Sequence, residues 1–198
     1  MFKHLSIGGQ GCCGHHITLG GLQKVLKALL VTPLEHNRRV LEVGCGLGYV
    51  VVELRCMDLP VIAVELETQA EVLRGAMVED ENVVIVPMDV RDFRLETFQR
   101  SGCTTITCFV GIGSVTEHVI GLFLDSPMAV ELAYLVPHDT TAKHEDRRVW
   151  GRHDVETQDF CVQLAGSRGA RRWVKVVRKK GFYIGRSRGS GCIRGCRV

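Results

Sequence analysis

Apolar residues follow two different spacings as far as Pro137, and each spacing predicts a different element. Short apolar runs are typical of buried strands, whereas apolar residues three or four positions apart mark one face of a helix. The first helix is expected over residues 19–30 and ends before Thr32 and Pro33, because proline breaks a helix. Strands are expected at 39–43, 61–65, 83–87, 104–110 and 129–136, with helices at 49–57, 68–77, 95–101 and 116–124 between them.

Five strands separated by helices predict an α/β protein. Helical crossovers join parallel strands, so we expect a Rossmann-like, mostly parallel sheet with helices on both faces. After Pro137 the pattern changes: residues 138–154 are polar and aperiodic, and residues 159–164 and 171–177 alternate as two strands. These two strands are expected to form an antiparallel C-terminal hairpin at the edge of the sheet, with residues 182–184 as a candidate extension.

Length and composition fit a single domain followed by a tail. A chain of 198 residues with 45% hydrophobic residues has enough apolar side chains for one core. We therefore expect one domain over residues 1–184. Residues 185–198 are rich in glycine, serine and arginine, a composition typical of disordered segments.

The sequence contains no stretch with the apolar length of a membrane span or the apolar core of a signal peptide. We expect an intracellular protein, cytoplasmic or nuclear, with no membrane partner. Nine cysteines are scattered and odd in number, so reduced thiols fit better than a disulfide framework. Residues 12–16 (CCGHH) are of types that bind zinc, but adjacent pairs suit one tetrahedral centre poorly and no second pair completes it, so no metal site is expected.

Charge is divided unevenly along the chain. Residues 167–198 contain eight arginines, three lysines and no acidic residue, a charge of +11. The whole chain has a net charge of +3, which leaves −8 for the other 166 residues. A basic C-terminal segment of this kind favours contact with a polyanion such as nucleic acid, although a solubilising tail has the same composition.

Three glycines alternate with other residues directly after the first predicted strand. The segment 40–49 reads VLEVGCGLGY, so Gly44, Gly46 and Gly48 lie at a turn from strand to helix, where α/β folds bind ligands. A dinucleotide site has Gly-x-Gly-x-x-Gly, and Tyr49 stands here in place of the third glycine. The spacing argues against NAD and favours a nucleoside ligand without a pyrophosphate, lying against a loop where any side chain would collide with it.

The segment 42–48 (EVGCGLG) resembles the first motif of class I S-adenosylmethionine-dependent methyltransferases. The resemblance implies a Rossmann-like fold, S-adenosylmethionine as the cofactor, and transfer of its methyl group to an acceptor. It places six residues of the motif at the cofactor: Glu42, Gly44, Cys45, Gly46, Leu47 and Gly48. Glu42 would lie near the ammonium group of the methionine, where opposite charge favours it.

The next two strand ends match further positions of that family. The second strand ends at Glu65, whose carboxylate can accept two hydrogen bonds from ribose hydroxyls. The resemblance places Asp89 near the adenine amino group and Val90 against the adenine ring, with residues 92–93 as an alternative pair. Each residue alone has a simpler explanation, since Glu65 could be a surface carboxylate and Asp89 a helix cap. Three motifs in the correct order at three successive strand ends together favour a methyltransferase.

A narrower resemblance concerns the acceptor. Thr18 and Leu19, the glycine motif and residues 91–93 (RDF) resemble the core of the non-SET histone lysine methyltransferases of the disruptor-of-telomeric-silencing type, over residues 15–135. This resemblance implies that Thr18 and Leu19 line the cofactor from the N-terminal side. It also implies a protein lysine as acceptor, with the basic tail docked on nucleosomal DNA. Residues 109–111 (FVG) depart from the Asn-Asn-Phe of that subfamily.

Several functions stay open at this point. Residues 109–111 also lack the Asn/Asp-Pro-Pro-aromatic motif of many methyltransferases that act on nitrogens of nucleic acids. No catalytic base is assigned, because in-line methyl transfer depends mainly on alignment and a deprotonated nucleophile. The preferred function is methyl transfer to a macromolecule, a protein lysine first and RNA or another nucleic acid second; a non-catalytic subunit that keeps the fold is the alternative. Trp150, Trp173 and Tyr183 fit either base stacking or packing of the hairpin.

Overall fold

The computed structural model describes most of the predicted domain. The described residues are 17–30, 38–77, 80–137, 149–151, 153–165 and 170–181. Predictions about residues 12–16, most of the polar segment 138–154, residues 182–184 and the tail 185–198 concern parts of the chain outside these ranges. No helix of the described residues is long and apolar enough to span a bilayer.

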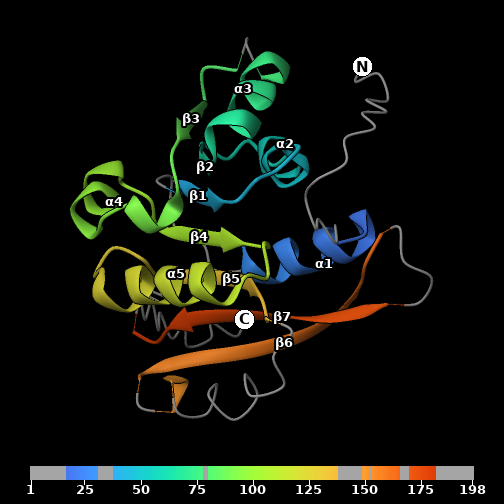
Figure 1. The fold of residues 1–198 in the computed structure, drawn as a ribbon. Coiled ribbons are helices and arrows are strands. Elements are labelled where there is room, and N and C mark those ends of the chain that lie inside the picture. The colour runs from blue at the N-terminus through green and yellow to red at the C-terminus, as the bar shows by residue number, and fades with distance from the viewer. Residues whose placement is uncertain are drawn as a thin grey trace, which may run out of the picture.

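Helices and strands alternate through the chain as the apolar pattern predicts, up to the C-terminal hairpin (Figure 1). In chain order the elements are α1 (Leu19–Leu29), β1 (Val40–Val43), α2 (Tyr49–Arg55), β2 (Val61–Glu65), α3 (Glu67–Ala76), β3 (Val83–Pro87), the 3-10 helix η1 (Val90–Asp92), α4 (Leu95–Ser101), β4 (Thr105–Cys108), α5 (Gly113–Asp125), β5 (Glu131–Leu135), β6 (Val155–Gln163) and β7 (Arg171–Lys179).

Seven strands form one sheet in the order β3-β2-β1-β4-β5-β7-β6. The first five strands are parallel, and β7 runs antiparallel to both β5 and β6. Figure 1 shows this succession from β3 near the top to the long β6–β7 hairpin near the bottom. The expected fold class is therefore confirmed, including the antiparallel hairpin at the edge of a mostly parallel sheet.

The hairpin begins earlier than its apolar residues predict. Strand β6 starts at Val155, four residues before the predicted start at Asp159. Residues 156–159 are exposed, so no apolar alternation marks them, and backbone pairing of Val155 with Lys179 determines where the strand begins. Polar side chains on the solvent side of an edge strand hide such a strand from a search for apolar patterns.

Two apolar clusters cover the two faces of the sheet. Helices α1, α2 and α3 contribute Leu26, Leu54 and Leu73 to one cluster. Helices α4 and α5 contribute Phe98 and Phe123 to the other. Side chains of a strand alternate between the faces, so a central strand needs apolar residues at nearly every position. This requirement explains why β1, β2 and β4 read as continuous buried runs.

Buried aromatic residues close the second cluster beside the hairpin. The indole of Trp150 is buried, donates a hydrogen bond to the Tyr134 hydroxyl at 3.1 Å, and meets the Phe123 ring edge-on at 6.0 Å between centroids. Packing, not base stacking, is therefore the role of Trp150. Trp173 is 45% exposed, and Tyr183 lies outside the described residues.

The described cysteines are all free thiols, as expected. Cys45, Cys103 and Cys108 are buried, whereas Cys56 and Cys161 are exposed. Burial raises the pKa of Cys103 to about 11 and that of Cys108 to about 12, so both thiols stay protonated at neutral pH.

Candidate functional site

The carboxyl ends of the five parallel strands meet at one edge of the sheet, here called the carboxyl edge. In open α/β sheets, ligands bind at this edge where the strand order reverses, and β1 lies at that point between β2 and β4. Strand β1 runs directly into the glycine loop, residues 44–48. Its three glycines have φ values of 67°, 52° and 82°, a region that side chains disfavour.

Two of these glycines are required by packing within the protein. A Cβ added to Gly44 would lie 2.0 Å from Cγ2 of Val110, and a Cβ added to Gly48 would lie 2.4 Å from Cδ1 of Leu73. The loop therefore has little room at both ends because the segment after β4 and helix α3 press against it. Packing within the protein therefore already requires glycine at these two positions, and exclusion of a side chain by the ligand stays a prediction.

Gly46 differs, because a Cβ added there would meet no atom within 4 Å. The Gly46 N–H donates a hydrogen bond to Oε2 of Glu65 at 2.7 Å, and the Leu66 N–H donates to Oε1 at 2.8 Å. Glu65 therefore turns toward the glycine loop and lies beside the open space over Gly46. A carboxylate can accept about four hydrogen bonds, so acceptor sites remain on both oxygens.

Glu42 is the most enclosed acidic residue of the loop region. It is 1% exposed within β1, and its Oε2 accepts a hydrogen bond from the Thr107 hydroxyl on β4. Burial raises the pKa of the Glu42 carboxyl well above its ordinary value, the Thr107 hydrogen bond opposes this shift, and the charge of Glu65 adds to it. Thr107 was not predicted, since its role depends on pairing of β1 with β4.

The remaining motif residues divide between core and surface. The Cys45 side chain is buried, and its thiol pKa is raised chiefly by desolvation. Leu47 is 42% exposed. Exposed large apolar side chains also lie at Tyr49, the first residue of α2, and beyond the ends of β2 and β4, at Leu66 and Ile112. Large apolar side chains left in water around a loop are typical of a ligand-binding surface.

Asp89 follows β3 at the same edge and is held by Arg91. Its carboxylate accepts hydrogen bonds from the Arg91 N–H and from Nε, both at 2.9 Å, and pairs with Nη2. These contacts lower the pKa of Asp89 to about 2. Asp89 therefore caps η1, which is the simpler explanation given above. Val90 is buried in the core, and so is Phe93 of the alternative pair.

Thr18 and Leu19 lie at the start of α1. This helix packs on β5, β6 and β7, whereas β2 is near the opposite end of the strand order. The Thr18 N–H donates to the Gln163 carbonyl at the end of β6 at 2.9 Å, and Leu19 is 58% exposed. Helix α1 packs against β5, β6 and β7, so its first residues share the carboxyl edge with the glycine loop. The structure brings Gly46 and Glu65 into contact but shows no direct contact of either with Thr18 or Leu19.

A further charged residue at this edge was not predicted. Arg172 near the start of β7 is 8% exposed and donates from Nη2 to the Val136 carbonyl at 2.8 Å. A Cβ added to Gly111, after β4, would lie 3.4 Å from the same Nη2 atom. Within the sequence Arg172 is one of many basic residues near the C-terminus, and only the pairing of β7 with β5 brings it to this edge.

Three solved structures have the same arrangement of elements. S. pombe Dnmt2 methyltransferase superposes with a TM-score of 0.56 at 14% identity, over 72% of this chain and 49% of that one. The putative RNA methyltransferase PH1948 from Pyrococcus horikoshii gives 0.57 at 14% identity, over 79% of each chain. Magnesium protoporphyrin IX methyltransferase (ChlM) from Synechocystis PCC 6803, solved with bound SAM, gives 0.60 at 11% identity, over 81% of this chain and 78% of that one.

The chain has the class I methyltransferase fold. At these identities the likeness establishes the fold alone, and the chain spans about half the length of the S. pombe enzyme. No protein-family model matches the sequence, and no match was found among curated proteins. The narrower likeness to the non-SET histone lysine methyltransferases finds no support in these structures.

Proposed function

We propose that the protein binds S-adenosylmethionine at the glycine loop and transfers its methyl group to a macromolecular acceptor, with RNA as the first candidate. The observation that carries the proposal is the contact between Glu65 and Gly46. It holds a carboxylate at the end of β2 beside the part of the loop that has open space above it. A nucleoside lying there would offer its ribose hydroxyls to that carboxylate.

The residues at the carboxyl edge fit the parts of this cofactor. Glu65 would accept hydrogen bonds from the ribose hydroxyls. Asp89 at the same edge would lie near the adenine amino group, whereas Val90 is buried and has little surface to offer the ring. Leu47 and Leu66 are half exposed and would lose contact with water against an apolar ring. Glu42 would balance the ammonium group of the methionine, and Thr18 with Leu19 would close the site from the side of α1.

Bound S-adenosylmethionine supplies an activated methyl group on a sulfonium. The protein's own contribution is then alignment, since an in-line displacement requires the acceptor atom opposite the sulfur. Gly44 packs closely on Val110, so the cofactor loop lies directly against the segment after β4. No residue among those described is assigned as a general base.

Comparison of the fold favours RNA over a protein lysine as the first acceptor to test. PH1948 is described as a putative RNA methyltransferase, and a neighbour from Streptococcus thermophilus as an rRNA methylase. The basic composition of residues 167–198 is compatible with that acceptor. The protein-lysine acceptor stays a prediction from the residue pattern, as do an intracellular location and contact of the basic tail with a polyanion.

Calorimetry with S-adenosylmethionine tests the cofactor site directly. Glu65→Ala removes two charge-assisted hydrogen bonds to ribose and is expected to weaken binding at least tenfold. Glu67→Ala, two residues further on at the exposed start of α3, removes the same charge and is expected to leave binding within about twofold. Equal affinity of Glu65→Ala and wild type would remove Glu65 from the site.

A methyl-transfer assay identifies the acceptor class. Tritiated S-adenosylmethionine is offered with RNA, DNA, free histones and nucleosomes at one fixed salt concentration. Labelling of RNA supports the proposal, and labelling of histones alone would favour the protein-lysine acceptor. Binding of the cofactor without labelling of any acceptor would favour a non-catalytic subunit.

A further inference from the structure

Arg172 is a buried cation at the edge of the sheet where the acceptor is expected. It stands opposite Val162 in the pairing of β7 with β6, and its side chain is on the same face as Val174 and Val176, toward α1. Only 8% of the residue is exposed, and its guanidinium lies at the carboxyl edge of the sheet beside Gly111. Desolvation lowers its pKa from the ordinary value, but arginine stays protonated at any physiological pH.

The protein satisfies this guanidinium only in part. Its one hydrogen bond runs from Nη2 to the Val136 carbonyl at 2.8 Å, and none of the carboxylates within the described ranges pairs with it. A guanidinium has five N–H donors in a planar fork that matches an oxyanion. A buried cation without a carboxylate is costly, so a charged partner that arrives with a ligand would stabilise it.

A short chain of contacts connects Arg172 with the cofactor loop. Val110 packs on Gly44, and a Cβ added to the next residue, Gly111, would lie 3.4 Å from Nη2 of Arg172. One peptide unit therefore separates the residue that packs on the glycine loop from the residue that packs on Arg172. A ligand that approaches the methyl group from the side of β4 and β5 would reach the free donors of this fork.

We propose that the Arg172 guanidinium binds a phosphate of a nucleic-acid acceptor and so sets the position of the nucleotide to be methylated. The inference rests on the proposed methyltransferase function and adds the recognition group for the acceptor. Arg171 and Trp173, on either side of Arg172, are exposed, and because side chains alternate along a strand they lie on the other face of the sheet, outside this site. A phosphodiester is favoured over a lone carboxylate because RNA is the proposed acceptor, and each of its phosphates offers two oxygens to the planar fork.

The test uses a short random-sequence oligoribonucleotide with a fluorescein label and measures its binding by fluorescence anisotropy. Arg172→Gln is expected to weaken binding about tenfold, because one bidentate charge-assisted contact is lost. The slope of log affinity against log salt is expected to fall by about 1, as for one phosphate contact. Arg172→Lys keeps the charge without the fork and is expected to recover only part of the affinity.

The matched control is Arg171→Gln. It removes the same charge from the adjacent, exposed position, so it is expected to change oligoribonucleotide affinity by less than about threefold. A neutral peptide nucleic acid of the same composition is expected to bind wild type and Arg172→Gln equally, because it has no phosphates. Thermal unfolding of each variant is measured alongside, and Arg172→Lys carries the comparison if Arg172→Gln does not fold.

Calorimetry with S-adenosylhomocysteine separates this inference from the proposed function. This compound is what S-adenosylmethionine becomes when it loses its methyl group. Unchanged affinity of Arg172→Gln for that product, with weakened binding of the oligoribonucleotide, supports the inference. Equal loss of both affinities would assign Arg172 to the cofactor's carboxylate and overturn it, as would equal losses in the Arg171 and Arg172 variants. Absence of product binding in wild type would instead contradict the proposed function.

Discussion

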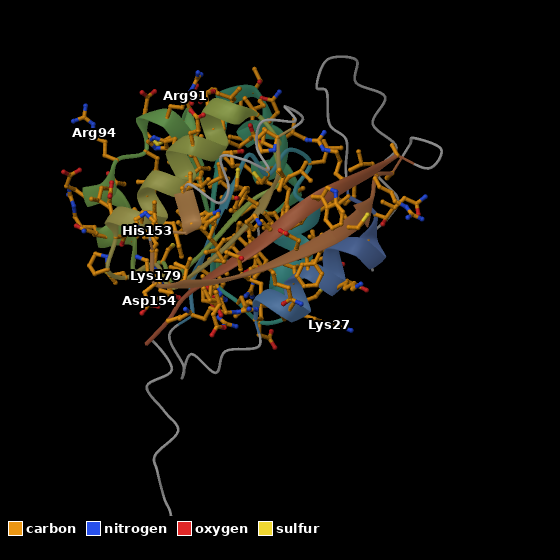
Figure 2. All side chains as sticks on the ribbon, turned by 90° about the horizontal axis from the view of Figure 1, so that it is seen from below. Lys27, Arg91, Arg94, His153, Asp154 and Lys179 are labelled. Carbon is orange, nitrogen blue, oxygen red and sulfur yellow. The ribbon has the colours of Figure 1, made fainter. Side chains whose placement is uncertain are left out.

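The two ends of β7 bury arginines in different surroundings. At the amino edge of the sheet, where β5 starts and β7 ends, Glu131 is 1% exposed and Arg38 contacts it at 3.0 Å, with Arg178 at 4.0 Å. Thr105 donates a further hydrogen bond to Glu131 at 3.0 Å, and Arg178 donates to the Ala28 carbonyl of α1. Nearby, where β7 ends and β6 begins, Asp154 pairs with Lys180 at 3.3 Å, and Figure 2 labels Asp154 beside the neighbouring Lys179.

Arg172, at the other end of the same strand, has a backbone carbonyl in place of a carboxylate. Arg172 and Arg178 both belong to the basic segment 167–198, and both side chains are turned toward the face of the sheet that α1 covers. Burial alone therefore does not distinguish structural charge from functional charge. The distinction lies in whether the protein itself supplies the counter-charge, and this is the case at the amino edge.

The largest effect on stability is expected from removing the carboxylate at the amino edge. Glu131→Ala leaves Arg38 and Arg178 buried beside each other without their carboxylate and is expected to lower the free energy of unfolding by about 3–5 kcal/mol. Urea denaturation measures it, with Glu156→Ala as control, because Glu156 is exposed and stands opposite Arg178 on β6. The control is expected to change stability by less than about 0.5 kcal/mol.

Arg172→Gln sharpens the comparison in the same experiment. It removes one hydrogen bond and no ion pair among the described residues, so its cost is expected to be about 1 kcal/mol or less. A loss as large as that of Glu131→Ala would show that Arg172 is structural, and the difference between the two ends of β7 would disappear.

The second prediction compares two glycines of the loop. Gly44→Ala places a Cβ against Val110 at a positive φ and is expected to destabilise the fold by about 3 kcal/mol. Gly46→Ala meets open space, so only its backbone conformation is strained and about 1 kcal/mol is expected. Urea denaturation separates the two variants.

Gly46 is expected to matter more for cofactor binding than for stability. A methyl group over Gly46 occupies the space proposed for the cofactor, so Gly46→Ala is expected to weaken S-adenosylmethionine binding well beyond its small effect on stability. Val110→Ala, combined with Gly44→Ala, should restore part of the lost stability, since it removes the Cγ2 atom that collides. Wild-type affinity in Gly46→Ala would place the ligand elsewhere.

The cofactor side of the sheet could be predicted from sequence because its determinants are local. Gly46 lies three residues after β1 ends and Glu65 is the last residue of β2, so the apolar runs alone bring both to one edge. The acceptor side depends on Val110, Gly111, Val136 and Arg172, which only the crossover and the hairpin bring together. No spacing within the chain encodes that contact.

Boundaries were missed for similar physical reasons. Helix α5 starts at Gly113, three residues before the prediction, because glycine and serine at its start have weak helix propensity and no apolar periodicity. The polar half of β6 carries no apolar signal either. Strand β6 is extended by backbone pairing with β7, and the start of α5 is closed by hydrogen bonds from Thr116 to the Ile112 carbonyl. Such bonds leave no trace in composition.

The last prediction concerns Glu42, the buried acid of β1 whose partner is the Thr107 hydroxyl. Its pKa is raised in the folded state, so the folded protein binds a proton more readily than the unfolded chain. The contribution of Glu42 to stability is therefore fully present below the ordinary carboxyl pKa of about 4.3 and is lost as the pH rises toward the raised pKa, by at most about 1.4 kcal/mol per pH unit. Glu42→Gln keeps the hydrogen bond with Thr107 and is expected to remove this slope.

Cofactor binding offers an independent measurement of the same group. A bound ammonium favours the ionised carboxylate, so binding of S-adenosylmethionine to wild type should release a fraction of a proton and strengthen as the pH rises. Calorimetry in buffers of different ionisation enthalpy detects that release, and Glu42→Gln is expected to abolish it. Unchanged proton release in the variant would mean that another group titrates. Glu42 would then have a structural role, as Glu131 has.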